Sequence, residues 1–200
     1  MVIDSHLHVL KAENFDEVTE AQIGHRHPED TPIEDLVGWL VDAGVHKAVV
    51  MGQDTTRMWN SSCGEDYVLE CVNQYPDLFV PLAAVEAVDR SGRLNRAGLE
   101  YVERAVLDHH FKGMLLTPPY GHYSSDDPQV YPFYEKALEL DVVVQYHHCA
   151  TSAGVALAPY RYCRPESLHN VLIDFPGMKV VLEHLNYPWY EELFFLMANP

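Results

Sequence analysis

The chain has 200 residues, of which 48% are hydrophobic, and its formal net charge at pH 7 is −17. This length and apolar content suffice for one substantial core, so we expect a single domain over residues 1–200. The acidic excess excludes a typical nucleic-acid surface, because phosphate binding needs clustered lysine and arginine. The sequence shows neither an apolar run long enough to span a membrane nor a signal peptide, so we expect a cytoplasmic protein without a membrane partner. The four cysteines have no CxxC spacing, which favours free thiols.

The first ten residues predict a short buried strand that carries two histidines. His6 and His8 are separated by Leu7, and apolar residues flank them. Side chains alternate along a strand, so both imidazoles are expected on one face while Leu7 packs behind them. Two imidazoles on one face can converge on one cation.

Residues 11–32 are polar and acidic, and we expect a long loop there with at most a helical turn. His25 and His27 repeat the spacing of the first pair, but Gly24 and Pro28 bracket them. A solvated loop is the favoured interpretation of this second pair.

Beyond residue 30 the sequence alternates between amphipathic helical segments and short apolar segments. Helices are expected at 31–43, 66–75, 94–107, 130–140, 165–175 and 190–198, and strands at 47–51, 78–85, 112–116, 142–146 and 179–183. Such alternation indicates a parallel sheet covered by helices, in a doubly wound sheet or a barrel. Because histidines stand where a dinucleotide-binding fold would have a glycine-rich turn, we favour an α/β fold of the (β/α)8 TIM-barrel type, with about six βα units present.

Histidines recur where the predicted strands end. His147 follows the strand at 142–146, and His184 follows the strand at 179–183, which is the rim where such barrels carry their active groups. Alternation predicts that two sets of side chains face the barrel interior, namely Val143, Gln145 and His147, and Val180, Leu182 and His184. His148 is expected to point away from it. Four histidines at one rim favour a metal site or a proton relay over packing.

Four segments resemble the amidohydrolase superfamily, specifically its amidohydrolase-related group, which includes the aminocarboxymuconate semialdehyde decarboxylase-like enzymes. They are residues 3–8, 111–118, 142–148 and 175–185, and the resemblance extends over essentially the whole chain. It implies that His6, His8 and His147 bind a divalent metal, usually zinc. It also implies that His184 either assists water at the metal or touches the substrate.

Two departures from this family pattern stand out. Leu115 occupies the position of the lysine that bridges two metals in dinuclear members, so a single metal ion is expected. The family's catalytic aspartate ends an eighth strand, whereas only six units are present here. We therefore expect either a longer natural polypeptide or a contribution from another segment. Open apolar strand edges recruit other chains, so the sequence is also compatible with a homo-oligomer.

Three functions fit this ligand set. The first is a hydrolase that uses a mononuclear zinc-type site to activate water against a small lactone, amide or ester. The alternative is a metal-dependent decarboxylase of an aromatic or unsaturated carboxylic acid, which needs the same ligands. The second alternative is a non-catalytic barrel protein, which the missing aspartate favours.

Candidate contacts to a small-molecule substrate lie in the loops at the same rim. Arg57 could pair with a substrate carboxylate in bidentate fashion, although a surface arginine is the simpler interpretation. The aromatic candidates for a pocket that holds a planar or cyclic substrate are Tyr120, His122, Tyr187 and Trp189. Ordinary loop packing explains such aromatic residues equally well. Away from this rim, His109, His110 and His169 are interpreted as structural.

Overall fold

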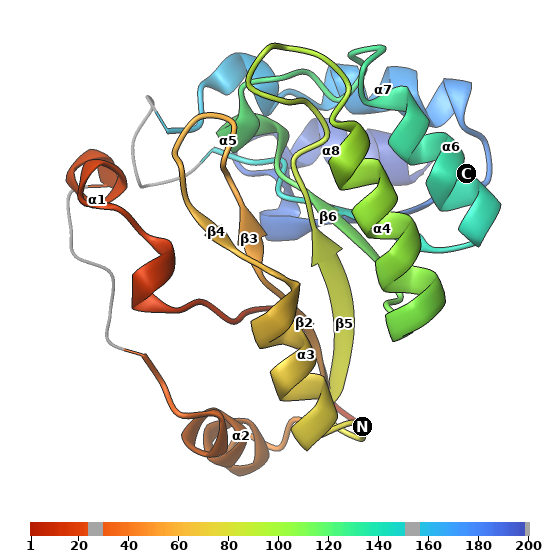
Figure 1. The fold of residues 1–200 in the computed structure, drawn as a ribbon. Coiled ribbons are helices and arrows are strands. Elements are labelled where there is room, and N and C mark those ends of the chain that lie inside the picture. The colour runs from red at the N-terminus through yellow and green to blue at the C-terminus, as the bar shows by residue number, and fades with distance from the viewer. Residues whose placement is uncertain (24–29, 151–156, 199–200) are drawn as a thin grey trace.

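Six parallel strands form the central sheet of the computed structural model, which describes residues 1–23, 30–150 and 157–198 (Figure 1). In sheet order they are β1 (Ile3–His8), β2 (Lys47–Met51), β5 (Phe79–Ala84), β6 (Gly113–Leu116), β7 (Val143–Tyr146) and β8 (Lys179–Leu182). Within this sheet, each strand pairs with the one that follows it in the chain, as in part of a TIM barrel. A two-stranded antiparallel ribbon, β3 (Gln53–Asp54) and β4 (Ser62–Cys63), follows β2.

Helices connect these strands and cover the outer face of the sheet. They are α2 (Ile33–Asp42), α3 (Glu65–Gln74), α4 (Arg96–His109), α6 (Tyr131–Leu140) and α7 (Pro165–Asp174), and α8 (Tyr190–Met197) follows β8. Every strand and helix predicted beyond residue 30 is confirmed with ends within two residues. The ribbon of β3 and β4 and the short helix α5 (Pro118–Gly121) were not predicted, because neither is long enough to show a period.

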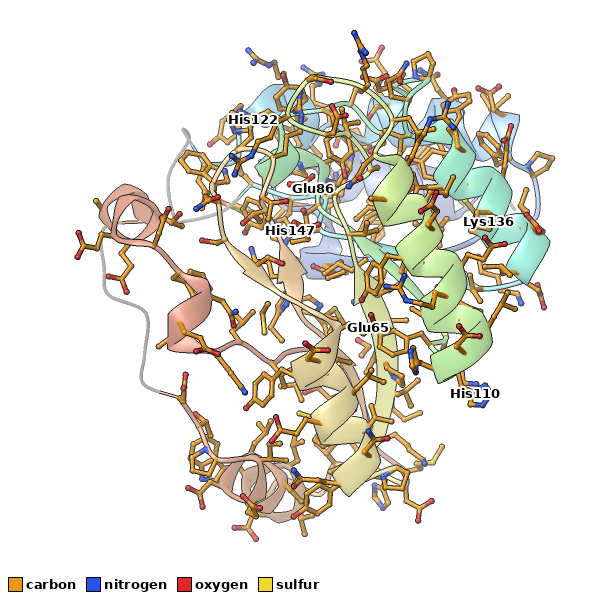
Figure 2. All side chains as sticks on the ribbon, viewed as in Figure 1. Glu65, Glu86, His110, His122, Lys136 and His147 are labelled. Atoms are coloured by element: carbon orange, nitrogen blue, oxygen red, sulfur yellow. The ribbon has the colours of Figure 1, made fainter. Side chains whose placement is uncertain are left out.

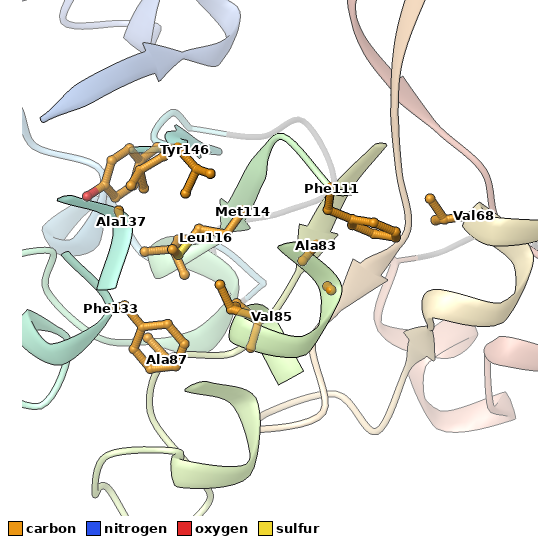
Figure 3. Packing of buried hydrophobic residues seen from close by; sticks show 14 of the residues in the cluster. Val68, Ala83, Val85, Ala87, Phe111, Met114, Leu116, Phe133, Ala137 and Tyr146 are labelled. Carbon is orange, nitrogen blue, oxygen red and sulfur yellow. The ribbon is translucent and has the colours of Figure 1, made fainter. Parts of the chain in front are cut away.

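The strands separate two apolar layers. The larger layer lies between the sheet and its helices, where Met114, Leu116 and Tyr146 pack against helical residues such as Phe133 (Figure 3). The smaller one lies on the barrel interior and is built on Met51, Leu82 and Leu115. Leu115 thus faces the interior, at the position where the family resemblance places a bridging lysine.

The structure corrects the predicted face of β8. Val180 and Leu182 pack on the helix-side core rather than facing the interior. Val181 pairs in register with Gln145 of β7, whose side chain points inward toward Met51 and Ser5. Because alternation then places Glu183 on the interior face, the strand delivers a carboxylate to the site instead of an imidazole.

The predicted loop at 11–32 contains more helix than expected, since a 3-10 turn, η1 (Ala12–Asn14), and the helix α1 (Glu17–Ile23) lie in it. His25 and His27 lie outside the described residues. Strands β1 and β8 form the two edges of the sheet and carry exposed apolar side chains, among them Ile3 and Val181. Among the described helices, none combines the length and the apolar character that crossing a membrane requires.

Candidate active site

Three of the four predicted histidines meet at the carboxyl ends of the strands. The ring of His184 lies 5.4 Å from that of His6 and 5.0 Å from that of His147, measured between centroids. The rings of His6 and His8 are 4.6 Å apart, as expected for neighbours on one face of a strand. In Figure 2, His147 lies toward the same end of the sheet as Glu86 and His122, whereas His110 lies toward the opposite end. The sequence therefore located the rim correctly.

A bulge in β1 sets the position of the first histidine. Between Asp4 and Leu7 the register against β2 shifts, so three steps along β1 match two steps along β2. The carboxylate of Asp4 accepts a hydrogen bond from the backbone N–H of His6 at 3.1 Å within this bulge. Bulges of this kind re-aim a side chain and are frequent beside active sites.

The carboxylate of Glu183 joins β8 to β1 and β7. Its Oε1 lies 2.9 Å from Nδ1 of His6 and accepts a hydrogen bond from the amide of Gln145 at 3.0 Å. The same amide lies 3.1 Å from Nδ1 of His6. Its Oε2 lies 3.3 Å from Nδ1 of His147, an electrostatic contact rather than a well-aligned hydrogen bond. Burial alone would raise the pKa of Glu183, but its contacts with His147 and His6 outweigh burial and hold the pKa below its usual range. The group is therefore a carboxylate at neutral pH.

His8 is held by a backbone carbonyl. Its Nδ1 lies 2.8 Å from the carbonyl oxygen of Gly52, which can only accept, so Nδ1 carries the proton and Nε2 keeps its lone pair. Burial and the neighbouring His6 lower the pKa of His8 to about 4, so the ring is neutral at pH 7. Gly52 is required here, because a Cβ at this position would lie 2.0 Å from the carbonyl oxygen of Cys63 in the adjoining ribbon.

The three predicted metal ligands share one arrangement. Each of His6, His8 and His147 turns Nδ1 toward an oxygen acceptor, which leaves Nε2 to bind a cation. Metal-ligating histidines are usually oriented in this way, by a carboxylate or carbonyl on the other nitrogen. The chemistry of these donors thus suits a divalent metal ion, although the three histidines do not together form a compact group of ligand atoms in the described structure.

Two groups of potential ligand atoms are compact among the described residues. His147, Cys149 and His184 form one, and His6, Glu183 and His184 form the other; within each group the ligand atoms lie within 4.8 Å of one another. His8 belongs to neither, although its ring adjoins that of His6. Sequence reasoning missed Glu183 and Cys149. The available signal was their position, since Glu183 directly follows an apolar strand and Cys149 directly follows the two histidines after β7.

His184 reaches the site through an unusual backbone rather than through strand alternation. It lies in the 3-10 segment η3 (Glu183–Asn186), and its φ of 55° is left-handed, as are those of Leu185 and Asn186. This turn swings the imidazole back over the rim, where 44% of the side chain stays exposed. Burial of the remainder lowers its pKa below the usual value. His184 is therefore the most accessible of the clustered imidazoles.

His148 points away from this cluster, as alternation predicts. It is fully buried on the helix side, and its Nδ1 lies 2.8 Å from Oδ1 of Asn186. Burial lowers its pKa to about 4. The contact ties the end of β7 to the left-handed turn that carries His184. His148 therefore helps to hold this turn in place from the helix side of the sheet.

Two of the aromatic candidates, Tyr120 and His122, lie on the side of the histidine cluster where His147 is (Figure 2). Tyr120, on α5, stacks on His147 with ring centroids 4.4 Å apart and an interplanar angle of 21°. His122 lies one step further out, where its ring contacts Trp59 and stacks on Tyr162. Tyr120 therefore forms one wall beside the predicted metal ligands.

The other two aromatic candidates lie further from the cluster. Tyr187 is 60% exposed, and Trp189 packs on Tyr160 and lines a groove between α7 and α8. Of the histidines interpreted as structural, His109 contacts Glu65 at 3.5 Å on the outer layer. Substrate contacts by Tyr187 and Trp189 stay predictions.

Arg57 clamps three loops together. Its Nε donates to the carbonyl of Asp89 at 3.0 Å, and its Nη1 donates to the carbonyls of Gly121 and His122. The guanidinium thus ties the loop after β2 to the loops after β5 and β6. Binding of a substrate carboxylate by Arg57 stays a prediction.

Glu86, which follows β5, is a buried carboxyl group beside this clamp. It lines an open pocket of about 480 Å³ together with Arg57 and Arg90. Neither carboxyl oxygen has a hydrogen-bond partner within the described part of the chain. Burial and the nearby Asp54 raise the pKa of Glu86 well above its usual value, against a smaller opposing effect of Arg57. The folded protein therefore holds a proton there that the unfolded chain releases.

We expect Glu86→Gln to stabilise the protein increasingly as pH rises. Above the ordinary glutamate pKa of about 4.3, the unfolded chain loses this proton while the folded chain keeps it, so stability falls with pH up to the raised folded pKa. The loss is at most about 1.4 kcal/mol per pH unit, and the neutral glutamine avoids it. Urea unfolding of both proteins between pH 5 and pH 8 measures the difference. A constant difference across that range would contradict the assignment.

A parallel barrel sheet with histidines and a carboxylate at the carboxyl ends of its strands defines a class, the metal-dependent TIM-barrel enzymes. The chain belongs to the amidohydrolase family, whose model matches residues 3–199. This confirms the resemblance derived from the sequence. No protein with a curated description matches the chain.

Solved structures similar to this one share the fold over nearly the whole chain. An uncharacterised TIM-barrel protein from Bordetella bronchiseptica is 23% identical with a TM-score of 0.74, covering 98% of this chain and 71% of that one. The 2,6-dihydroxybenzoate decarboxylase from Rhizobium is 14% identical with a TM-score of 0.66, at 97% and 68% coverage. The 5-carboxyvanillate decarboxylase from Novosphingobium aromaticivorans, complexed with manganese and 4-hydroxy-3-methoxy-5-nitrobenzoic acid, is 12% identical with a TM-score of 0.69, at 99% and 70% coverage.

Proposed function

We propose that the protein is a divalent-metal-dependent decarboxylase of an aromatic or unsaturated carboxylic acid. The observation that carries the proposal is the shared orientation of His6, His8 and His147, each with Nδ1 close to an oxygen atom and Nε2 left to bind a metal ion. Two similar structures are decarboxylases of aromatic acids, which supports this alternative better than the hydrolysis placed first from sequence. Zinc stays the predicted metal, although one of those enzymes binds manganese.

The bound metal would supply a Lewis acid that polarises substrate oxygen atoms and orients the acid. The residues of the chain would orient the metal ligands and hold the substrate. Glu183 fixes two of the histidines and supplies negative charge beside the cation. Tyr120, stacked on His147, presents a flat wall against which a planar substrate can lie.

His184 is placed to transfer a proton. When the bond between the carboxylate and its carbon breaks, carbon dioxide leaves and the electron pair stays on the carbon, which must then take up a proton. His184 combines an exposed imidazole with contact to both His6 and His147. Its lowered pKa makes the protonated ring a stronger acid. We therefore assign the proton transfer to His184.

The test is carbon dioxide release from the two acids that name the similar enzymes, 2,6-dihydroxybenzoate and 5-carboxyvanillate, together with unsaturated dicarboxylic acids. A matched panel of lactones, amides and esters tests hydrolysis in the same preparations. Turnover of the second panel without any carbon dioxide release would overturn the decarboxylase proposal in favour of hydrolysis. A folded protein that binds no metal and turns over neither panel would support the non-catalytic alternative.

Removal of the metal is expected to abolish turnover. Dialysis against a chelator should reduce the rate to background, because the histidines alone cannot polarise the substrate oxygens. One equivalent of zinc or manganese per chain should restore it, since Leu115 cannot bridge a second ion. Elemental analysis gives the stoichiometry. Full activity of the stripped protein, or a need for two ions per chain, would contradict the mononuclear site.

A further inference from the structure

Cys149 places a thiol against the predicted metal ligands. It lies two residues beyond His147, and its Sγ is 3.6 Å from Nε2 of that ring, the nitrogen left for a cation. The side chain is buried, with 3% of its surface exposed, and the thiol is not part of a disulfide. Ligand atoms of His147, Cys149 and His184 all lie within 4.8 Å of one another. The family resemblance, with its three histidines, did not include this sulfur.

The separation of the two atoms matches shared coordination. Zinc binds histidine nitrogen at about 2.0–2.1 Å and thiolate sulfur at about 2.3 Å, so a tetrahedral centre separates the two ligand atoms by roughly 3.6 Å. The nitrogen and sulfur of this pair are in hydrogen-bond contact at 3.6 Å. The pair therefore already has the spacing that one metal ion would impose.

The backbone around the thiol is fixed by its own contacts. The Sγ of Cys163 donates to the carbonyl of Cys149 at 3.1 Å, and the N–H of Ala150 donates to the carbonyl of Tyr187 at 2.8 Å. The first contact lies within the connection between β7 and α7, and the second ties this connection to the loop after β8. Cys149 is thereby held beside His147 by the surrounding fold as well as by its place in the sequence.

We propose that Cys149 is a sulfur ligand of the metal ion that His147 binds. The inference rests on the metal site of the proposed function and adds a donor to it. On binding, the sulfur–hydrogen bond breaks, a sulfur–metal bond forms, and the proton passes to water. Zinc can expand to five ligands, which leaves a position for a substrate oxygen. Thiolate is a soft ligand, so this site prefers zinc or cobalt to manganese or magnesium.

Cobalt(II) spectroscopy of the whole chain tests the proposal, because sulfur bound to cobalt gives a near-ultraviolet charge-transfer absorption that histidine does not. The metal-free protein is titrated with cobalt alone, as wild type, Cys149→Ser and Cys163→Ser. Serine at 163 keeps a donor for the Cys149 carbonyl, so it is the matched control. Cys63 and Cys71 remain in all three proteins, so absorption arising from them would persist in Cys149→Ser.

We expect one cobalt ion per chain, with an absorption that is present in wild type and Cys163→Ser and lost in Cys149→Ser. Wild type that binds one cobalt without this absorption would overturn the sulfur ligand and leave the histidine site standing. Wild type that binds no cobalt would overturn the metal site itself, and the sulfur ligand with it. An absorption that persists in Cys149→Ser would also overturn the assignment to Cys149. If circular dichroism shows that Cys149→Ser fails to fold, Cys149→Ala takes its place in the comparison.

Discussion

Replacing Glu183 with glutamine is expected to weaken metal binding by about 10–100-fold, the usual cost of losing the group that orients a ligand histidine. One oxygen of the carboxylate lies 2.9 Å from Nδ1 of His6, and the other faces Nδ1 of His147. An amide has one acceptor atom, so one of these two rings would face an N–H₂ group and lose its orientation. The substitution also removes a negative charge that is almost completely buried beside the predicted metal ligand His147.

The matched control is Glu86→Gln, which makes the same change in another buried glutamate at the same end of the sheet. The charged and polar groups that act electrostatically on the Glu86 carboxyl are Asp54, Arg57 and Tyr123 rather than the histidines, so the metal affinity of this variant should stay at the wild-type value. Titration of zinc against a chromophoric chelator measures both variants. Wild-type affinity in a folded Glu183→Gln protein would show that the carboxylate does not support the ligands.

The strands and helices were predictable because their apolar periods are long and consistent. Near-continuous apolar strands such as β2 and β7 are buried on both faces, and the helices between them carry one apolar stripe. The rim was predictable for the same reason, since all parallel strands end on one side and a histidine at a strand end must lie there. Strand ends therefore located His6, His8, His147 and His184.

Which residue of β8 faces inward was not predictable from the residues alone. Val180, Val181 and Leu182 are all apolar, so the strand has no polar and apolar alternation that would distinguish its two faces. The register of β8 against β7 determines which side chains face the barrel interior, and it places Glu183 on that face. Extending strand alternation to His184 also failed, because three successive left-handed residues end the strand geometry at that point.

The roles of Arg57 and Glu86 depend on contacts between distant loops. Arg57 is separated by more than 30 residues from each carbonyl that it clamps, and no local pattern marks such pairs. Glu86 resembles any glutamate after a strand until its burial beside Asp54 is known. The sequence therefore predicts the site residues that lie at strand ends, but not the contacts that Arg57 and Glu86 make between neighbouring loops.

Replacing His184 with asparagine is expected to lower turnover by about 10²–10⁴-fold, the usual range for a lost general acid–base group. Asparagine is the suitable replacement because the residue has a φ of 55°, a left-handed conformation that asparagine tolerates better than most side chains. The turn should therefore persist while the transferable proton is lost. Steady-state rates of carbon dioxide release, measured with the metal content of each preparation, give the comparison.

The control is His110→Asn, which makes the same substitution at another left-handed histidine, with a φ of 59°. His110 ends α4 and precedes β6, so it lies at the opposite end of the sheet from the cluster (Figure 2). Both variants should keep one metal ion per chain, and only His184→Asn should lose turnover. Because a purely structural role would lower stability or metal content along with the rate, full metal occupancy with a wild-type melting temperature isolates proton transfer. Unchanged turnover in a metal-loaded His184→Asn protein would remove His184 from the chemistry and leave it as a residue of the rim.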